Sequence, residues 1–404
     1  MSVNTLNFEQ VSTVLTSIVQ QATHQTVLTP TDTGSFVSVA QVALRADRDS
    51  VMQAISNILA RTIFAIRPYS AKMTGLEMDS FRWGAMMRKL SIADSDWEDD
   101  KAYDYPIFYD ANQNPADGEG LSIDRWKIKK PNILQTNFYG QSVYSDHMTI
   151  TEDQLETAFS GPEQLGSFLT LLMTNLSNRL EMASENIRRG IACNAIGALY
   201  EENDSNRVIH LLSEYNSLAG ITPALTSHTV YDPANFPSFT KWVYSRVAEI
   251  TDLFTANSTM FQTVITGKPV LRHTPYEFQK VYLYSPFQRQ IEARVLADTY
   301  HDNFIRYADV ENIPFWQSID TRDTVKVTPS YVDTTGTLVT SSAQTVENVF
   351  GLIFDQDCMG MTLLNQRVLS TPVNESGLYR NIWVHGNFRA MFDNTEKCCL
   401  LLLD

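Results

Sequence analysis

The sequence has 404 residues, of which 43% are hydrophobic and 19% are charged, so the chain can bury a sizeable core and is not a disordered polypeptide. This length fits about two to three compact domains, or one elongated subunit with several parts. Lysine and arginine total 31 and aspartate and glutamate total 46, which gives a net charge of −15. Such a charge repels phosphate backbones and argues against a protein that grips nucleic acid.

Cysteine usage and the first residues indicate a cellular compartment. The four cysteines, Cys193, Cys358, Cys398 and Cys399, form no Cys-x-x-Cys pair and no short secreted framework, which predicts reduced thiols in an intracellular product. The opening MSVNTLNFEQVSTVL lacks the basic and apolar regions of a signal peptide. No apolar run reaches the roughly 20 residues of a membrane helix. We therefore expect no membrane partner.

The first third of the chain predicts helices followed by a long hairpin. Apolar spacing predicts helices at 7–23 and about 49–61, with a loop at 24–34 after the first. Residues 83–97 and 123–144 are extended and aromatic-rich, and they flank a turn-rich tip at 110–120.

The two arms of this hairpin carry opposite charges. An acidic end on one arm and a basic start on the other favour contacts between proteins over a nucleic-acid patch, given the net charge. Aromatic residues are the commonest interface anchors, although these could equally pack within their own subunit. The contact candidates are Trp83, Asp94, Asp96, Trp97, Glu98, Asp99, Asp100, Arg125, Trp126, Lys127, Lys129 and Lys130.

The longest periodic segment follows the hairpin. Thr151 with Gln154 and Ser160 with Glu163 fit capping boxes, which predict two helix starts in tandem. Apolar residues then recur every three or four positions from Leu165 to Ile191. A helix of about 38 residues would span roughly 57 Å. The spacing lacks strict heptads, so packing onto a sheet is favoured over a coiled coil.

The remaining elements make the class mixed α+β. We predict helices at 236–254 and 285–300, a strand at 280–284, a threonine-rich hairpin at 331–345, and strands at 349–354, 361–369, 382–392 and 398–403. The terminal KCCLLLLD is too short for a membrane tail and lacks a cysteine four residues from its end, which prenylation requires. A continuous apolar run instead predicts a strand buried on both faces, with Cys398 and Cys399 as small core residues.

Searches for catalytic and ligand motifs fail. There is no Gly-x-Gly-x-x-Gly, Walker, Gly-x-Ser-x-Gly or His-Glu-x-x-His motif. Asp110, Asn112 and Asn114 open like a calcium loop, but Pro115 and Leu121 replace its glycine and its bidentate glutamate. The seven histidines are scattered singly. We therefore predict no enzyme, catalytic residue, metal or cofactor.

In order along the chain, these elements resemble the HK97-type major capsid protein of tailed bacteriophages, in its phi29-like form. The resemblance is clearest in YLYSPFQRQIEARVLADTY (282–300), PNILQTNFYGQSVYSDHMTITEDQLETAF (131–159) and the closing stretch 349–403, with its Arg-bearing strand, Asp-Asn turn and apolar last strand. The resemblance implies an N-terminal arm (1–46), a peripheral domain (47–70 and 146–260) with a long spine helix, an E-loop (71–145), an axial domain (261–360) and a return to the peripheral domain (361–404). The apolar last strand would then close the peripheral-domain sheet against the spine helix.

The resemblance also implies a function in the virion. We expect self-assembly in the host cytoplasm into hexamers and pentamers of an icosahedral shell, around double-stranded DNA as weakly contacted cargo. A separate scaffold protein and a portal would be the other partners. Two alternatives stay open: a soluble enzyme whose active site is formed by residues far apart in sequence, and another virion protein such as a scaffold or portal.

Overall fold

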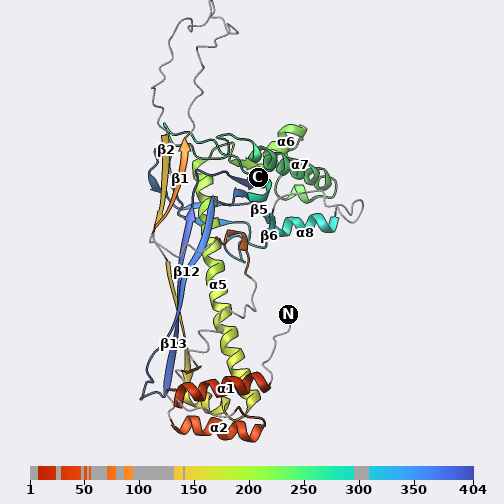
Figure 1. Cartoon of the computed structure of the whole chain (residues 1–404). Coiled ribbons are helices and arrows are strands. Elements are labelled where there is room, and N and C mark those ends of the chain that lie inside the picture. The colour runs from red at the N-terminus through yellow and green to blue at the C-terminus, as the bar shows by residue number, and fades with distance from the viewer. Residues whose placement is uncertain are drawn as a thin grey trace, which may run out of the picture.

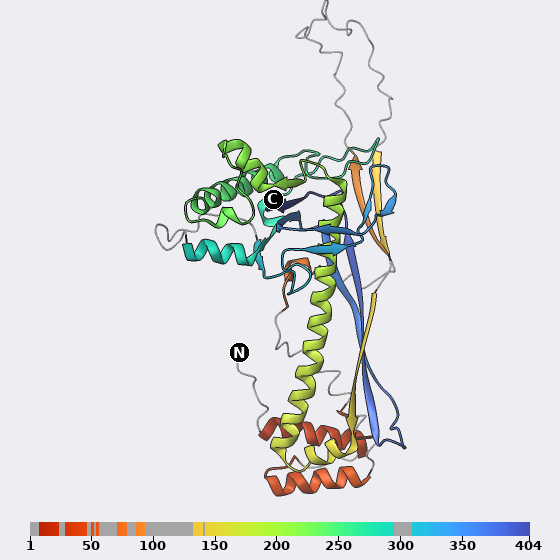
Figure 2. The ribbon, with the colours of Figure 1, turned by 180° about the vertical axis from the view of Figure 1, so that it is seen from behind.

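The computed structural model describes residues 8–23, 29–46, 50–51, 54–55, 71–78, 86–93, 132–139, 142–294 and 309–404. The described chain is elongated, and one long helix joins a small helical end to a larger α+β end (Figures 1 and 2). The helices are α1 (Phe8–Thr23), α2 (Thr33–Ala46), α4 (Glu152–Ala158), α5 (Pro162–Glu202), α6 (Leu211–Ala219), α7 (Phe236–Thr255) and α8 (Ser285–Arg294). The longer strands are β1 (Met86–Ala93), β2 (Asn132–Tyr139), β3 (Ser142–Thr151), β5 (Gln279–Tyr284), β6 (Asp309–Ile313), β11 (Val349–Asp355), β12 (Met359–Ser370), β13 (Tyr379–Phe392) and β14 (Cys398–Leu402). The short strands are β4 (Val208–His210), β7 (Val325–Val327), β8 (Ser330–Val332), β9 (Leu338–Thr340) and β10 (Gln344–Val346).

The long helix α5 is the predicted spine, and its 41 residues extend the predicted range slightly. It ends at Asn203, whose left-handed backbone lets its N–H donate to the carbonyl of Leu199 at 3.1 Å. The capping box of Thr151 and Gln154 is confirmed at the start of α4. The one predicted for Ser160 and Glu163 is wrong, because Gly161 is the N-cap and Pro162 occupies the first helical position.

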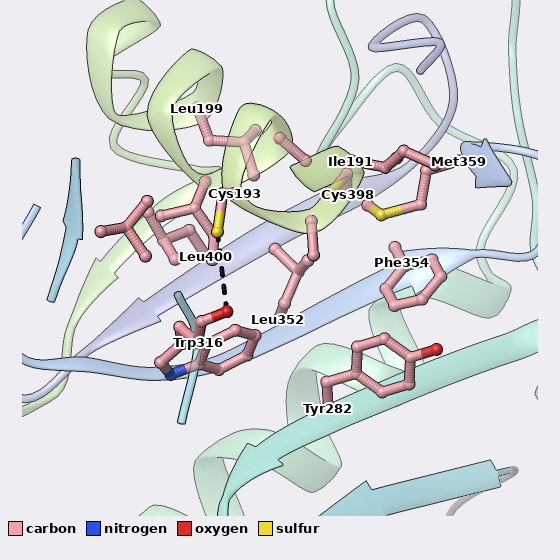
Figure 3. Packing of buried hydrophobic residues seen from close by; sticks show 14 of the residues in the cluster. Ile191, Cys193, Leu199, Tyr282, Trp316, Leu352, Phe354, Met359, Cys398 and Leu400 are labelled. Carbon is pink, nitrogen blue, oxygen red and sulfur yellow. Dashed lines mark hydrogen bonds between the residues drawn. The ribbon is translucent and has the colours of Figure 1, made fainter. Parts of the chain in front are cut away.

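The α+β end is built on a five-stranded sheet in the order β4-β14-β11-β5-β6. One face packs against the C-terminal half of α5 and the other against α6, α7 and α8. Figure 3 shows the spine-side core, where Ile191, Cys193 and Leu199 of the helix lie over Leu352 and Leu400 of the sheet. A sheet covered on both faces is expected to have strands with continuous apolar sequences, as β11 and β14 do.

The terminal strand β14 is confirmed as a strand buried on both faces. Its alternate residues enter different clusters: Cys398 and Leu400 face the spine, whereas Cys399 and Leu401 face the α7 side. The spine helix backs it as predicted. Strand β14 pairs antiparallel with β11 and parallel with β4, in a different sheet from β12 and β13. Both cysteines are fully buried free thiols, and burial raises the pKa of Cys399 far above its ordinary value.

A second sheet follows the spine toward the other end. It has the order β12-β13-β3, is antiparallel throughout, and runs beside α5 (Figure 2). Its inner residues Met148, Ile150, Ile382 and Val384 share one core with the N-terminal half of α5. The spine helix therefore contributes to two cores, this one and the spine-side core of the five-stranded sheet.

The helical end adds α1 and α2 to this second core. Helix α1 was predicted, but α2 occupies a stretch that begins in the expected loop, and Gly34 lies in its first turn. Asp32 caps it: the Ser35 N–H donates to Asp32 Oδ1 at 2.7 Å. The helix predicted at 49–61 is described only at four residues, all helical. The described part of the predicted arm thus packs on its own spine helix.

Two glycines of α5 provide a matched test of spine packing. A Cβ at Gly197 would collide with Val327 Cγ1 and lie 3.3 Å from Pro329 Cβ, whereas one at Gly190 would meet nothing within 4 Å. We expect Gly197→Ala to destabilise the subunit by about 1–3 kcal/mol through overpacking, because β-branched Val327 has little freedom to move. Gly190→Ala should stabilise it by up to about 1 kcal/mol through helix propensity. Denaturant unfolding of both variants checks this, and equal effects of the two changes would contradict it.

Candidate assembly interfaces

The base of the predicted hairpin forms an antiparallel pair with one exposed apolar side. Strands β1 and β2 pair from Met86 opposite Tyr139 to Ala93 opposite Asn132, which confirms that the predicted arms pair there. Alternate residues point outward, and Ile92 lies directly opposite Ile133. The exposed fractions are 62% for Leu90, 67% for Ile92 and 48% for Ile133. We call these three residues the hairpin outer face. Adjacent exposed aliphatic side chains of this kind mark surfaces that bind partners.

The opposite side of the hairpin lies on the body of the subunit. Ala93 and Leu134 are buried against Val270, with Ile265 beside them. The side-chain amide of Asn132 donates to the carbonyl of Gly267 at 3.0 Å, outside this small core. Among the described residues, the hairpin base is therefore docked by one small apolar cluster and by two hydrogen bonds, from Asn132 to the Gly267 carbonyl and from Lys268 Nζ to the Ile133 carbonyl at 3.1 Å.

Four charged side chains complete the docking, and we call them the hairpin clamp. Lys89 Nζ of β1 lies 2.9 Å from Asp393 Oδ2 and 2.5 Å from Glu396 Oε1. Arg272 Nη1 lies 2.8 Å from Glu396 Oε1, and its Nη2 donates to Ser91 Oγ at 3.0 Å. Burial raises the pKa of Glu396, although the two cations oppose that effect. Burial lowers the pKa of Lys89, but its two carboxylate partners outweigh this, so the net shift is upward.

The two carboxylates belong to a turn between β13 and β14, residues 393–397, that we call the buried turn. Its sequence DNTEK is entirely polar, yet all five residues are buried. Polar loops usually lie on the surface, where water satisfies their backbone groups. This turn is satisfied by protein instead: Asn394 Nδ2 donates to Glu202 Oε1 at 2.8 Å and to the Val332 carbonyl at 2.7 Å.

Lys397 ties the buried turn to helix α7. Its ammonium donates to the carbonyls of Phe254 at 3.0 Å and Ala256 at 2.6 Å, where the helix ends. Burial lowers the pKa of Lys397 to about 8. The turn is thus bound to the spine, to α7 and to the hairpin at once. Sequence patterns missed it because five polar residues between strands are typical of an exposed turn.

A second exposed surface is the outer side of the β12-β13-β3 sheet. His147 and Trp383 are opposite each other in the register and stack with ring centroids 4.4 Å apart. His385 follows on β13, nearly parallel to Trp383 at 6.1 Å. Leu369, opposite Trp383 on β12, is 56% exposed. This side offers a mixed aromatic and apolar surface away from the spine helix.

The contact candidates predicted from sequence lie outside the described residues. This applies to Trp83, Asp94, Asp96, Trp97, Glu98, Asp99, Asp100, Arg125, Trp126, Lys127, Lys129 and Lys130. The predicted tip at 110–120, with its partial calcium-loop pattern, lies outside them as well. The structure instead describes the docked base of the same hairpin. In the sequence, polar and apolar residues alternate from Lys89 to Ala93, and this alternation could have indicated a strand with two different sides.

The described residues offer little that points to ligand chemistry. Within them, no group of three or more His, Cys, Asp or Glu side chains could hold a metal ion. Their helices include none with the length and apolar character that crossing a membrane requires. Cys193 is buried in the spine-side core, where burial raises the pKa of its thiol to about 12.

The elongated spine, the two sheets and the docked hairpin define a class of protein. A chain in the capsid structure of Staphylococcus phage Andhra is 11% identical, with 84% of this chain and 87% of that chain covered and a TM-score of 0.51. Two further matches are weaker. A chain from the structure of head fiber and inner core protein gp22 of native bacteriophage P68 is 11% identical, with 83% and 85% covered and a TM-score of 0.49. A chain in the capsid structure of the Cyanophage P-SCSP1u is 10% identical, with 84% and 89% covered and a TM-score of 0.42. The first likeness shows that the fold is the HK97-like fold of phage capsid proteins.

The sequence identifies the family within that class. The family model described as Phi29-like phage major capsid protein matches residues 15–400. The chain therefore belongs to the Phi29-like phage major capsid protein family, and it is a virion structural protein that assembles with itself into the head shell. The comparison with curated proteins gives no match.

Proposed function

We propose that the subunit forms hexamers and pentamers that close an icosahedral shell around double-stranded DNA. The observation that supports this best is the docked hairpin, which has one side fixed to its own subunit and an apolar outer face available to a neighbour. Many such contacts, each weak alone, sum to a stable closed lattice when every subunit repeats them.

The other partners follow from the charge and from the class of protein. A net charge of −15 suits a shell that confines DNA without binding it tightly. Assembly would take place in the host cytoplasm with a separate scaffold protein and a portal. A structural role without catalysis is part of the same proposal.

The proposed domain division follows the two sheets. The β12-β13-β3 sheet and the N-terminal half of α5 would form the peripheral domain, and β1 with β2 the base of the E-loop. The five-stranded sheet with α6, α7 and α8 would form the axial domain. Because β14 lies in that sheet, the chain would cross into the axial domain at its last strand rather than end in the peripheral domain.

Expression of the full chain, with and without a candidate scaffold protein, tests the proposal. Negative-stain imaging and native mass measurement should find shells, or rings with the masses of five and six subunits. A monodisperse monomer or dimer under every condition would contradict it.

A further inference from the structure

We infer that Lys89 and Arg272 are positioning residues, which set the direction of the hairpin by pairing with Asp393 and Glu396 of the buried turn. This inference rests on the proposed function, because the direction matters only if the hairpin outer face must meet a second copy of the chain.

Apart from the hairpin clamp, the described contacts that dock the hairpin base lie at one end of it, where Asn132 donates to the Gly267 carbonyl and Lys268 donates to the Ile133 carbonyl. The apolar contact consists of Ala93 and Leu134 against the segment that contains Val270, and it lies at one end of the paired strands. On the same inner side of β1, the residues that precede Ala93 are the polar Ser91 and Lys89, so the apolar contact does not continue along the strand. An apolar contact at one end is non-directional and would let the pair pivot. Lys89 provides a second attachment point, four residues from Ala93, and two points fix a direction.

The clamp is built so that both cations share one anion. Lys89 and Arg272 each lie within 2.8 Å of Glu396 Oε1, and Arg272 also reaches Ser91 on β1. Two positive and two negative groups balance, and the side chains of Asp393 and Glu396 are 0% and 7% exposed. Such pairs are screened by salt far less than surface pairs are. Charge-assisted hydrogen bonds also restrict geometry more than apolar contacts do.

An attachment point defines a direction only if it is itself rigid, and the buried turn is. Asp393 Oδ1 accepts hydrogen bonds from the Thr395 N–H at 3.0 Å and from the Thr395 hydroxyl at 2.6 Å, which leaves Oδ2 for Lys89. The backbone N–H of Asp393 donates to the Cys358 carbonyl at 2.6 Å. Together with the contacts that Asn394 makes with Glu202 of α5 and that Lys397 makes with the end of α7, these bonds fix the position of the buried turn in its own subunit.

The energetics of the clamp favour a role in geometry over a role in stability. Buried ion pairs often add nothing to stability relative to apolar packing, and their best attested use is to specify one arrangement. Here burial raises the pKa of Glu396, which disfavours its carboxylate, whereas despite its burial the two carboxylates raise the pKa of Lys89, which favours its ammonium. The two shifts have opposite effects on folding, so the geometry of the clamp is the firmer ground for its role.

Distance measurements on the isolated subunit test the inference. Spin labels on cysteines introduced at Asn137 of β2 and Lys241 of α7 report the hairpin direction, since both positions are exposed and the four native cysteines are buried. Lys89→Met and Glu396→Gln should each broaden the distance distribution several-fold, and the double variant should broaden it no further, because both changes break one unit. Arg88→Met is the matched control: it removes the adjacent cation on the outward side and should leave the distribution unchanged.

Imaging of the same variants separates this inference from the proposed function. We expect Lys89→Met and Glu396→Gln to yield mostly aberrant or open particles under conditions in which the wild type closes shells. Wild-type distance distributions in both folded variants would overturn the inference, whatever the wild type assembles into. Absence of wild-type assembly would instead count against the proposed function, and the distances would still decide whether the clamp positions the hairpin.

Discussion

Deletion of residues 399–404 is expected to abolish folding of the subunit. The deletion removes β14 from between β11 and β4, so the five-stranded sheet loses an interior strand and its ladder hydrogen bonds on both sides. Cys399, Leu400, Leu401 and Leu402 are all 0% exposed and contribute to the cores on both faces. Truncation of a single buried leucine to alanine costs about 2–5 kcal/mol, and whole domains are stable by only about 5–15 kcal/mol.

Two point variants allow the loss of stability caused by the deletion to be compared with the loss caused by single substitutions in the same segment. Leu401→Ala should leave a folded subunit that is destabilised by about 2–5 kcal/mol, as measured by denaturant unfolding. Asp404→Asn should have a small effect, because the Asp404 side chain is exposed and its ion pair with the partly exposed His210, at 2.6 Å, lies at the surface. A soluble, cooperatively unfolding truncation would show that β14 is not required for the fold.

Replacement of both Ile92 and Ile133 with aspartate is expected to block assembly while the subunit still folds. The two side chains are 67% and 48% exposed, so polar replacements leave no cavity in the cores. Ile92 and Ile133 are directly opposite each other in the register, so two carboxylates there would repel each other. An apolar surface that covered the carboxylates would also remove their hydration, which is unfavourable. Loss of the contact in every subunit of a lattice multiplies the effect, so we expect shell yield to fall by at least about tenfold for each 1.4 kcal/mol lost per contact.

The control for this variant keeps the apolar surface and changes its shape. Ile92→Leu combined with Ile133→Leu should assemble with nearly wild-type yield, since volume and polarity are retained. Circular dichroism and denaturant unfolding should show that both double variants fold cooperatively, with the aspartate variant less stable by about 1 kcal/mol because its two carboxylates are opposite each other. Normal shells from the aspartate variant would show that the hairpin outer face makes no contact that assembly needs.

The elements that the sequence predicted well are those with a strong local period. The spine helix was predicted because apolar residues recur every three or four positions from Leu165 to Ile191, a local pattern that does not depend on tertiary contacts. The terminal strand was predicted because six consecutive apolar residues are too few for a membrane and suit a covered strand. Its neighbours in the sheet were not predictable, since pairing with β4 joins residues far apart in the chain.

The elements that were missed depend on tertiary context. Helix α2 begins with threonine and glycine after a proline, which resembles a loop, and its burial against α1 supplies the stability that its first turn lacks. The buried turn reads as an exposed polar loop, because only distant partners such as Glu202 and Lys89 make its burial possible. The clamp therefore had no signal in the sequence beyond the alternation on β1.

A cryo-electron microscopy reconstruction of particles assembled from the full chain would show whether the hairpin outer face of each shell subunit contacts a neighbouring copy, as we propose. We expect a closed lattice in which Leu90, Ile92 and Ile133 are covered by an adjacent subunit, while Lys89 remains paired with Asp393 and Glu396 of its own subunit. A lattice in which these three residues face solvent, or a chain that forms no lattice at all, would contradict this proposal.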